Sequence, residues 1–348
     1  MRTTLLAGRL LPLILLLFVG SLPVMAQTNW AVEKKLMIGG EGAWDYLTVD
    51  PKTHRLFVPR STHTMVIDAD SGKTLGDIPG QKIAHGVAIV PEVGRGFISD
   101  GGGDGAVVVF DLTTYAALGK IIAQPDADGI IFDPGSGLVL VVSGDKGVLM
   151  SFKPGIDLMS GKIDAPIDLG GAPEFLASDG AGKLYVNLMD KDEVAVVDLR
   201  ERKVVARWSV APGGSPVGMS IDTKNGRLFI GCRNPRKLIV MSTKDGKVLS
   251  DMPIGERVDA TRVENGQVFA SCRDGSLSVA GEKSPGEFEI VQVVKTHVGA
   301  STMTIDSTAH RIYLPAAEFE DSKDGPKGRP KPKAGTFMIV VVAPQGAQ

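Results

Sequence analysis

The sequence predicts an all-β protein, a seven-bladed β-propeller of four-stranded antiparallel blades. A hydrophobic segment of five residues recurs seven times at spacings of 40 or 44 residues, and six copies have Phe or Tyr in the second place. A period of this length, built from short strands, is typical of propeller blades. The copies are LFVPR from Leu56, GFISD from Gly96, LVVSG from Leu140, LYVNL from Leu184, LFIGC from Leu228, VFASC from Val268 and IYLPA from Ile312.

Residues 1–26 have the pattern of a secretory signal peptide. Arg2 and Arg9 precede an apolar run over residues 10–20, and a small-residue cleavage site ends the segment at Ala26. The run is short for a membrane span and no second long apolar stretch follows, so we expect no transmembrane anchor after cleavage. We therefore expect a periplasmic or secreted protein whose propeller occupies residues 27–348.

Each repeat contains four predicted strands. A shorter apolar strand precedes each aromatic one, and turns rich in Gly, Pro, Asp and Asn join them. A third and a fourth strand follow, as over residues 194–198 and 204–210. A lone strand over 31–38 precedes the first repeat, and the last repeat stops at its third strand, 337–342. Pairing these two strands would complete the last blade and close the ring.

Residues 318–334 interrupt the repeat pattern in the last blade. The segment is charged and Pro-rich and has no apolar periodicity, so we expect a flexible loop. It would be either a tolerated insertion or an arm that contacts a partner.

Charge and cysteine content narrow the partners and the chemistry. The chain has 38 basic and 40 acidic residues; without Arg2 and Arg9 the difference is 36 − 40, a net charge of −4. This balance argues against nucleic-acid binding, which needs a basic face.

Cys232 and Cys272 occupy the same place in successive repeats. Face-packed sheets lie about 10 Å apart, but a disulfide needs Cα atoms within about 7 Å. Two buried thiols are therefore favoured, with a disulfide as the alternative.

The repeats resemble the YVTN-type repeats of the bacterial YncE-like β-propeller family. The resemblance is clearest in LYVNL from Leu184 and in the valine-rich strand and turn over residues 65–73. It implies an exported seven-bladed protein that acts as a binding or interaction module. DNA binding has been associated with this family, but the acidic balance argues against it here. We expect a monomer whose partner is a small ligand or a protein.

One column of residues could hold a ligand. The loops that enter the innermost strands of a propeller open on one face, so the residue before each of these strands lies at the mouth of the central channel. In order, these residues are Asp45, His85, Asp128, Glu174, Val217, Asp259 and Ser301. To the polar members of this column we add Trp44 as a stacking surface and four arginines that could pair with the acids: Arg60, Arg233, Arg262 and Arg273.

Carboxylates held close together must be protonated, neutralised by arginine or bridged by a cation. A divalent Ca²⁺, Mg²⁺ or Mn²⁺ ion would suit oxygen ligands with one imidazole, although the sequence establishes no cofactor. The candidate ligands are Asp45, His85, Asp128, Glu174 and Asp259. Alternatively, these side chains cap loop amides and pair with the arginines.

No complete catalytic motif is present. Cys-x-x-Cys-His, Gly-x-Ser-x-Gly and the P-loop pattern are all absent. The first functional hypothesis is therefore a non-catalytic propeller that binds a ligand or protein at its loop face and channel mouth. The alternative, by analogy of fold, is a lactonase-like or other metal-assisted hydrolase that uses the acidic column.

Overall fold

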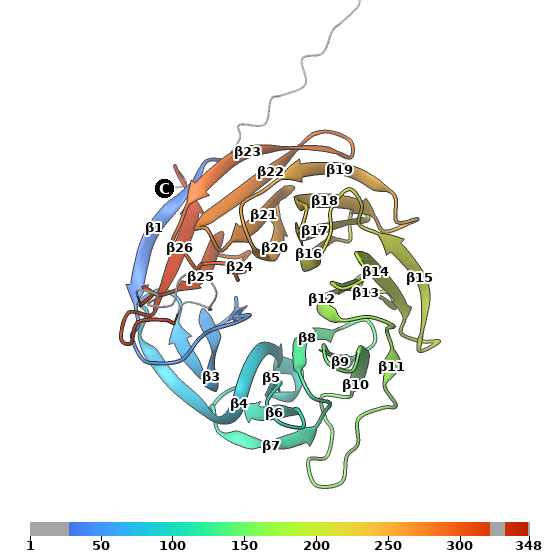
Figure 1. Ribbon diagram of the computed structural model, residues 1–348. Coiled ribbons are helices and arrows are strands. Elements are labelled where there is room, and N and C mark those ends of the chain that lie inside the picture. Colours follow the sequence, from blue (N-terminus) through green and yellow to red (C-terminus); the bar gives the residue numbers. More distant parts are fainter. Residues whose placement is uncertain (1–27, 321–330, 347–348) are drawn as a thin grey trace, which may run out of the picture.

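The computed structural model describes residues 28–320 and 331–346. The expected signal peptide and the central part of the expected flexible loop lie outside these residues. The described strands stand as sheets around a central axis (Figure 1). Within each sheet, neighbouring strands are antiparallel.

The described strands form six sheets, one of six strands and five of four. The six-stranded sheet contains β2 (Thr48–Asp50), β3 (Arg55–Asp68), β4 (Thr74–Val90), β5 (Arg95–Asp100), β6 (Ala106–Asp111) and β7 (Ala117–Ile122). The next two contain β8 (Ala127–Asp133), β9 (Leu138–Ser143), β10 (Val148–Phe152) and β11 (Ile167–Asp168), then β12 (Pro173–Ser178), β13 (Lys183–Leu188), β14 (Glu193–Asp198) and β15 (Lys203–Ser209). They are followed by β16 (Pro216–Asp222), β17 (Arg227–Arg233), β18 (Arg236–Ser242) and β19 (Val248–Pro253), then β20 (Val258–Glu264), β21 (Gln267–Cys272), β22 (Ser276–Ser284) and β23 (Glu287–Lys295). The last sheet contains β24 (Thr304–Asp306), β25 (Arg311–Ala316), β26 (Met338–Pro344) and β1 (Trp30–Met37); a short 3₁₀ turn, η1 (Pro91–Val93), lies between β4 and β5.

The expectation of seven four-stranded blades is wrong, because the described strands form six hydrogen-bonded sheets. The first two sequence repeats share the six-stranded sheet through β4, a single strand of 17 residues. Ser61 of β3 lies opposite Ala84 in the second half of β4, and His63 lies opposite Pro79 in the first half. The second half also pairs with β5, where Val87 lies opposite Ile98. With this register no turn separates the two repeats, and their strands become one sheet.

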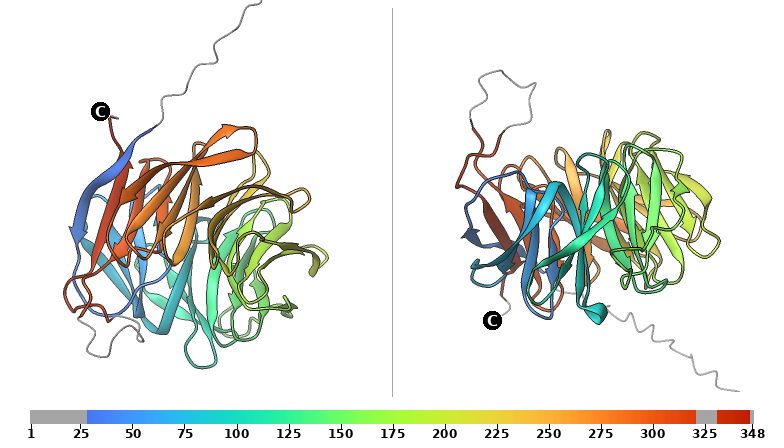
Figure 2. Two further views of the ribbon diagram at one scale, coloured as in Figure 1. Left: turned by 45° about the horizontal axis from the view of Figure 1, so that its top comes forward. Right: turned by 90° about the horizontal axis from the view of Figure 1, so that it is seen from below.

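The predicted pairing of the two chain ends is confirmed. β1 runs antiparallel to β26, from Trp30 opposite Pro344 to Met37 opposite Met338. Figures 1 and 2 show β1 as the outer strand of the last sheet, beside β26. This pairing closes the ring and supplies the outer edge of β26 with a partner strand.

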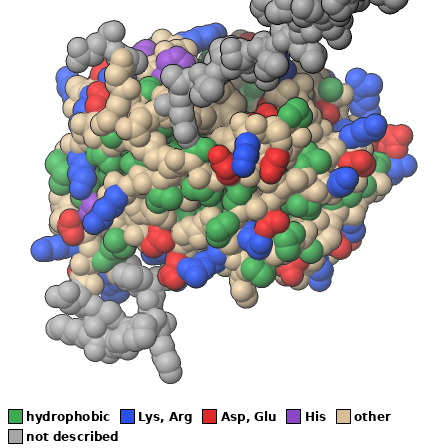
Figure 3. Space-filling view, turned by 90° about the horizontal axis from the view of Figure 1, so that it is seen from above, with side chains coloured by type: hydrophobic (Ala, Val, Ile, Leu, Met, Phe, Trp, Pro, Cys, Tyr) green, Lys and Arg blue, Asp and Glu red, His purple; other side chains and the backbone are tan. Residues whose placement is uncertain are grey.

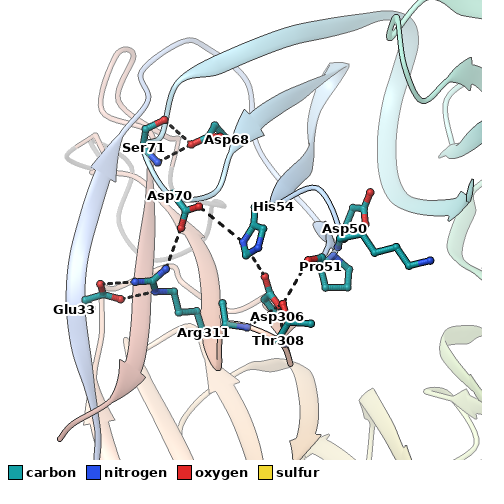
Figure 4. A network of polar contacts seen from close by, with 12 residues as sticks. Glu33, Asp50, Pro51, His54, Asp68, Asp70, Ser71, Asp306, Thr308 and Arg311 are labelled. Atoms are coloured by element: carbon teal, nitrogen blue, oxygen red, sulfur yellow. Dashed lines mark hydrogen bonds and ion pairs between the residues drawn. The ribbon is translucent and has the colours of Figure 1, made fainter. Parts of the chain in front are cut away.

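Polar contacts hold the first and last sheets together (Figure 4). Arg311 on β25 contacts Glu33 of β1 at 2.8 Å and Asp70 at 3.0 Å. His54 lies 3.5 Å from the buried carboxylate of Asp306. His54, in the turn between β2 and β3, therefore links the first sheet to the end of β24 in the last sheet.

Buried aromatic and aliphatic side chains fill the spaces between neighbouring sheets. The aromatic residues of the recurring segment are all buried: Phe57, Phe97, Tyr185, Phe229, Phe269 and Tyr313. Cys232 and Cys272 are free and buried, which confirms two thiols over a disulfide. Burial raises the pKa of each thiol to about 12, so both remain protonated at neutral pH.

The described ends of the 318–334 segment are paired with each other. Phe319 and Pro332 form an isolated antiparallel bridge, and Glu320 N donates to Lys331 O at 2.9 Å. Residues 321–330, on which the expected flexibility mainly falls, lie outside the described residues.

Among the described residues, no helix is long and apolar enough to cross a membrane. On the side seen in Figure 3, acidic and basic side chains are interspersed and form no continuous basic face.

Candidate functional site

A cavity of about 660 Å³ lies at the end of the channel where the inner strands begin. We call it the mouth cavity. Of the residues predicted from the sequence, nine line it: Trp44, Asp45, His85, Asp128, Glu174, Arg233, Asp259, Arg273 and Ser301. Val217, the apolar member of the column, is fully buried and does not line the cavity. The polar column residues therefore gather as the repeat predicted, while their ligand-binding role stays a prediction.

The pairing register of the inner strands shifts at the column residues. In the sheets that begin with β8, β12 and β16, register with the second strand shifts across Asp128, Glu174 and Val217. The same shift occurs across His85 and Asp259. A β-bulge leaves a residue unpaired and re-aims its side chain. The bulges thus leave the column residues unpaired in the ladder where the inner strands begin.

His85 is held between two carboxylates. Its Nδ1 lies 2.7 Å from Asp45 Oδ2 and 3.6 Å from Asp128 Oδ1. Gly101 leaves room for the ring, since a Cβ there would lie 2.9 Å from His85 Nε2. Although burial opposes the charged form, the hydrogen bond to Asp45 and the charges of Asp128 and Asp45 raise the pKa of His85 to about 9.

Burial also makes the neighbouring carboxylates harder to ionise. It raises the pKa of Asp45 and raises that of Asp128 well above its usual value, with His85 opposing both shifts. Burial likewise raises the pKa of Glu174 to about 7. Among the described residues, Glu174 has no hydrogen bond or ion pair. This side of the cavity therefore retains protons at neutral pH.

The opposite side of the cavity is rich in arginine. Arg233 forms an ion pair with Asp259 and donates from Nε to the carbonyl of Val258 at 3.1 Å. Burial would lower the pKa of Arg233, but Asp259 and Glu174 outweigh it and the pKa is raised. Ser301 donates to the second oxygen of Asp259 at 2.6 Å. Asp259 is therefore fully engaged by its neighbours.

A metal ion would have one closely grouped set of donors among the described residues. Asp45, His85 and Asp128 each offer an atom, and these atoms all lie within 4.8 Å of one another. Asp128 Oδ1 is buried without a hydrogen-bond partner in the described structure. The other two predicted ligands, Glu174 and Asp259, lie outside this group. The donor set fits a divalent ion, which would have to displace the proton shared by His85 and Asp45.

Two of the predicted arginines do not line the mouth cavity. Arg60 is 1% exposed and donates to four backbone carbonyls in the loop over residues 39–43. Its guanidinium also lies 3.7 Å from the ring centre of Phe337. Arg262 lines a separate cavity deeper in the channel. Neither is placed to neutralise the acidic column.

Asp126, Arg257 and Tyr46 are among the lining residues of the mouth cavity that sequence reasoning missed. Asp126 and Arg257 each stand two residues before the column, with left-handed φ angles of 55° and 56°. Ser215 occupies the same repeat position with φ 49°. Comparing the position two residues before the column across the repeats could have identified Asp126 and Arg257. Tyr46 follows the column directly and reaches across the channel, where its hydroxyl donates to the backbone carbonyl of Asp259 at 3.4 Å.

Comparisons with known proteins support the fold alone. No protein-family model matches the chain, and no curated protein matches its sequence. The chain is similar in structure to hydrazine synthase of Kuenenia stuttgartiensis, with 13% identity, a TM-score of 0.67 and coverage of 85% of this chain and 96% of that chain. It is also similar to a chain in the crystal structure of a mitotic checkpoint complex, with 13% identity, a TM-score of 0.70 and coverage of 89% and 96%. At this identity the likeness shows a β-propeller fold and no specific function.

Proposed function

We propose that this protein is an exported, YncE-like propeller that binds a small zwitterionic ligand in the mouth cavity and does not catalyse its conversion. The division of charge around the cavity is the observation that supports the proposal. One side, the acidic arc, contains Asp45, His85, Asp126, Asp128 and Glu174 from three adjacent sheets. The other side, the basic arc, contains Arg233, Arg257, Arg273 and Lys331 from the remaining sheets, together with Asp259, which is paired with Arg233.

Glu174 is the group we assign to the cationic end of the ligand. It faces the cavity, has no ion pair among the described residues, and has a pKa near 7. A ligand ammonium group beside it would favour the ionised carboxylate and lower this pKa. Binding should therefore release a proton from Glu174 and strengthen as the pH rises through 7.

The basic arc would receive the anionic end. Arg257 and Arg273 border the cavity opposite the acids, and a guanidinium can donate two parallel hydrogen bonds to a carboxylate. The ring of Trp44 lies at the same cavity and packs against Phe319, 6.1 Å away between ring centres. These rings supply an apolar wall for the body of the ligand.

Export and family membership belong to this proposal as well. The pattern of residues 1–26 supports export to the periplasm or outside the cell. The YVTN-type segments, such as LYVNL from Leu184, support a YncE-like binding module. The net charge of the mature chain supports a small ligand or a protein as partner over nucleic acid.

Calorimetry with a series of ω-amino acids, from glycine to 6-aminohexanoate, tests the proposal. We expect at least one member to bind with proton release, seen as a heat that depends on the buffer, and to bind at least tenfold more weakly to Glu174→Gln. Hexylamine serves as the probe with a single charge. Glu256→Gln is the matched control, because the Glu256 side chain is 64% exposed and lies outside the cavity lining. No binding by any zwitterion, or equal binding by Glu174→Gln, would refute this function.

A metal-assisted hydrolase is the second candidate, favoured by the grouping of Asp45, His85 and Asp128. These residues would hold the ion, which would polarise an ester or lactone carbonyl. Titration with MnCl₂, CaCl₂ and MgCl₂ should then show one bound ion per chain, lost in Asp128→Asn, together with turnover of a lactone. If no ion binds and no lactone is hydrolysed, this candidate is rejected.

A further inference from the structure

A second cavity, of about 480 Å³, lies deeper in the channel. We call it the lower cavity. Tyr46 borders both cavities, and its ring centre lies 4.7 Å from that of Phe175. Pro91 and Pro134 also line the lower cavity, and each belongs to the turn that follows an inner strand. The lower cavity therefore opens on the face of the ring opposite the mouth.

The walls of the lower cavity are mainly apolar. Inner strands contribute Val87, Ile89, Ile130, Ile131 and Phe132, with Phe175 beside Tyr46. Only two of the lining residues carry a charged side chain, Glu92 and Arg262. Glu92 is exposed and lies in η1, so it belongs to the rim. Arg262 is thus the cation of an otherwise apolar compartment.

Arg262 is only partly exposed, and its guanidinium has few partners. It stands three residues after Asp259 on the inner strand β20, which places it about 10 Å deeper in the channel. One nitrogen donates to the carbonyl of Thr261 at 2.8 Å, and the guanidinium lies 5.3 Å from the ring centre of Phe175. Within the described structure it forms no ion pair, which leaves most of its five N–H groups without a protein acceptor.

Two other arginines, Arg233 and Arg60, are neutralised or saturated with acceptors. Arg233 is paired with Asp259, and Arg60 is surrounded by four carbonyl oxygens. Burial lowers the pKa of Arg262 to about 10, and Tyr46 opposes this shift. A partly buried cation without a counter-ion is unfavourable, and an anion bound beside it would relieve that cost.

We propose that the lower cavity binds a small organic monocarboxylate, with its carboxylate on Arg262 and its apolar body against Ile131, Phe132 and Phe175. A planar carboxylate can accept two parallel hydrogen bonds from one guanidinium. The single cation and the acidic rim residue Glu92 disfavour an anion with several charges, and the apolar walls favour a hydrocarbon body. This site is independent of the zwitterion site, because its ligand meets different residues on the other side of Tyr46.

Methyl NMR on isoleucine-labelled protein, titrated with hexanoate, tests this inference. We expect saturable shifts of the Ile89 and Ile131 methyl groups, both of which line the lower cavity. Arg262→Met should weaken hexanoate binding at least tenfold, whereas Arg236→Met should leave it unchanged, because Arg236 lies on the surface in an ion pair with Glu256. 1-Hexanol, which has no negative charge, should bind at least tenfold more weakly than hexanoate.

Three results would overturn the proposal. The first is equal hexanoate binding by Arg262→Met, and the second is equal binding of 1-hexanol by the wild type. The third is a set of shifts confined to Ile122 and Ile163, which line a different cavity beside Lys120 and Lys162. Should Arg262→Met fail to fold, the wild-type shift pattern and the 1-hexanol comparison still decide between these outcomes. If the zwitterion proposal fails, calorimetry with the Glu174→Gln variant will show it, and the hexanoate result in the lower cavity will be unaffected.

Discussion

The two cavities of the channel differ in how their charged side chains are compensated. In the mouth cavity, carboxylates lie next to a histidine and an arginine, as in the contacts Asp45–His85 and Arg233–Asp259. In the lower cavity, Arg262 stands among apolar side chains without an ion pair in the described structure. Asp259 and Arg262 lie three residues apart on the inner strand β20, so different depths of the channel support different chemistry. Polar groups that are paired with each other stabilise the fold, while an unpaired cation among apolar side chains can receive a ligand.

Arg233→Gln should have the largest effect on stability. It removes the partner of Asp259 and the nearest positive charge to Glu174, and leaves two partly buried carboxylates uncompensated. We expect a loss of roughly 3 kcal/mol in the free energy of unfolding at pH 8, measured by urea denaturation. The exposed ion pair of Arg236 offers the matched control, and Arg236→Gln should change stability by less than about 0.5 kcal/mol. Equal losses in the two variants would contradict the difference we draw between paired buried groups and surface pairs.

The pH dependence of stability should be the next largest effect. The pKa of His85 is raised from 6.5 to about 9, so between these values the folded state binds more protons than the unfolded chain. Stability from this group is fully present below pH 6.5 and is lost as the pH rises through 9. We expect a fall on the order of 2 kcal/mol over this window, and a flatter profile in His85→Gln. A variant profile as steep as that of the wild type would assign the titration to another group.

Arg262→Met should have the smallest effect on folding. The substitution replaces an unpaired cation by an apolar side chain of similar length, in a cavity with apolar walls. Replacing buried charge in this way is often neutral or stabilising, so we expect a change within about 1 kcal/mol of the wild type. Urea denaturation at pH 7 measures it. A loss as large as that of Arg233→Gln would show that Arg262 is structural and would weaken the comparison of the two cavities.

The sequence repeat predicted the propeller and the pairing of the chain ends, and sequence analysis named nine of the residues that line the mouth cavity. It did not predict how the first two repeats join, because the pairing of Ser61 with Ala84 depends on a register that the local pattern does not specify. The depth of Arg262 was readable in principle from its offset of three residues from Asp259. The role of Arg60 was not, because the backbone carbonyls that surround it come from a glycine-rich loop positioned by long-range packing.

The protonation state of His85 tests the central claim most directly. Ring ¹⁵N chemical shifts of the labelled protein, followed from pH 5 to pH 10, report the charge of each histidine. We predict that His85 stays protonated until about pH 9, because Asp45 and Asp128 hold its proton, and that Asp45→Asn lowers this pKa. If His85 loses its proton near 6.5 in the wild type, the channel mouth does not gather these side chains as described.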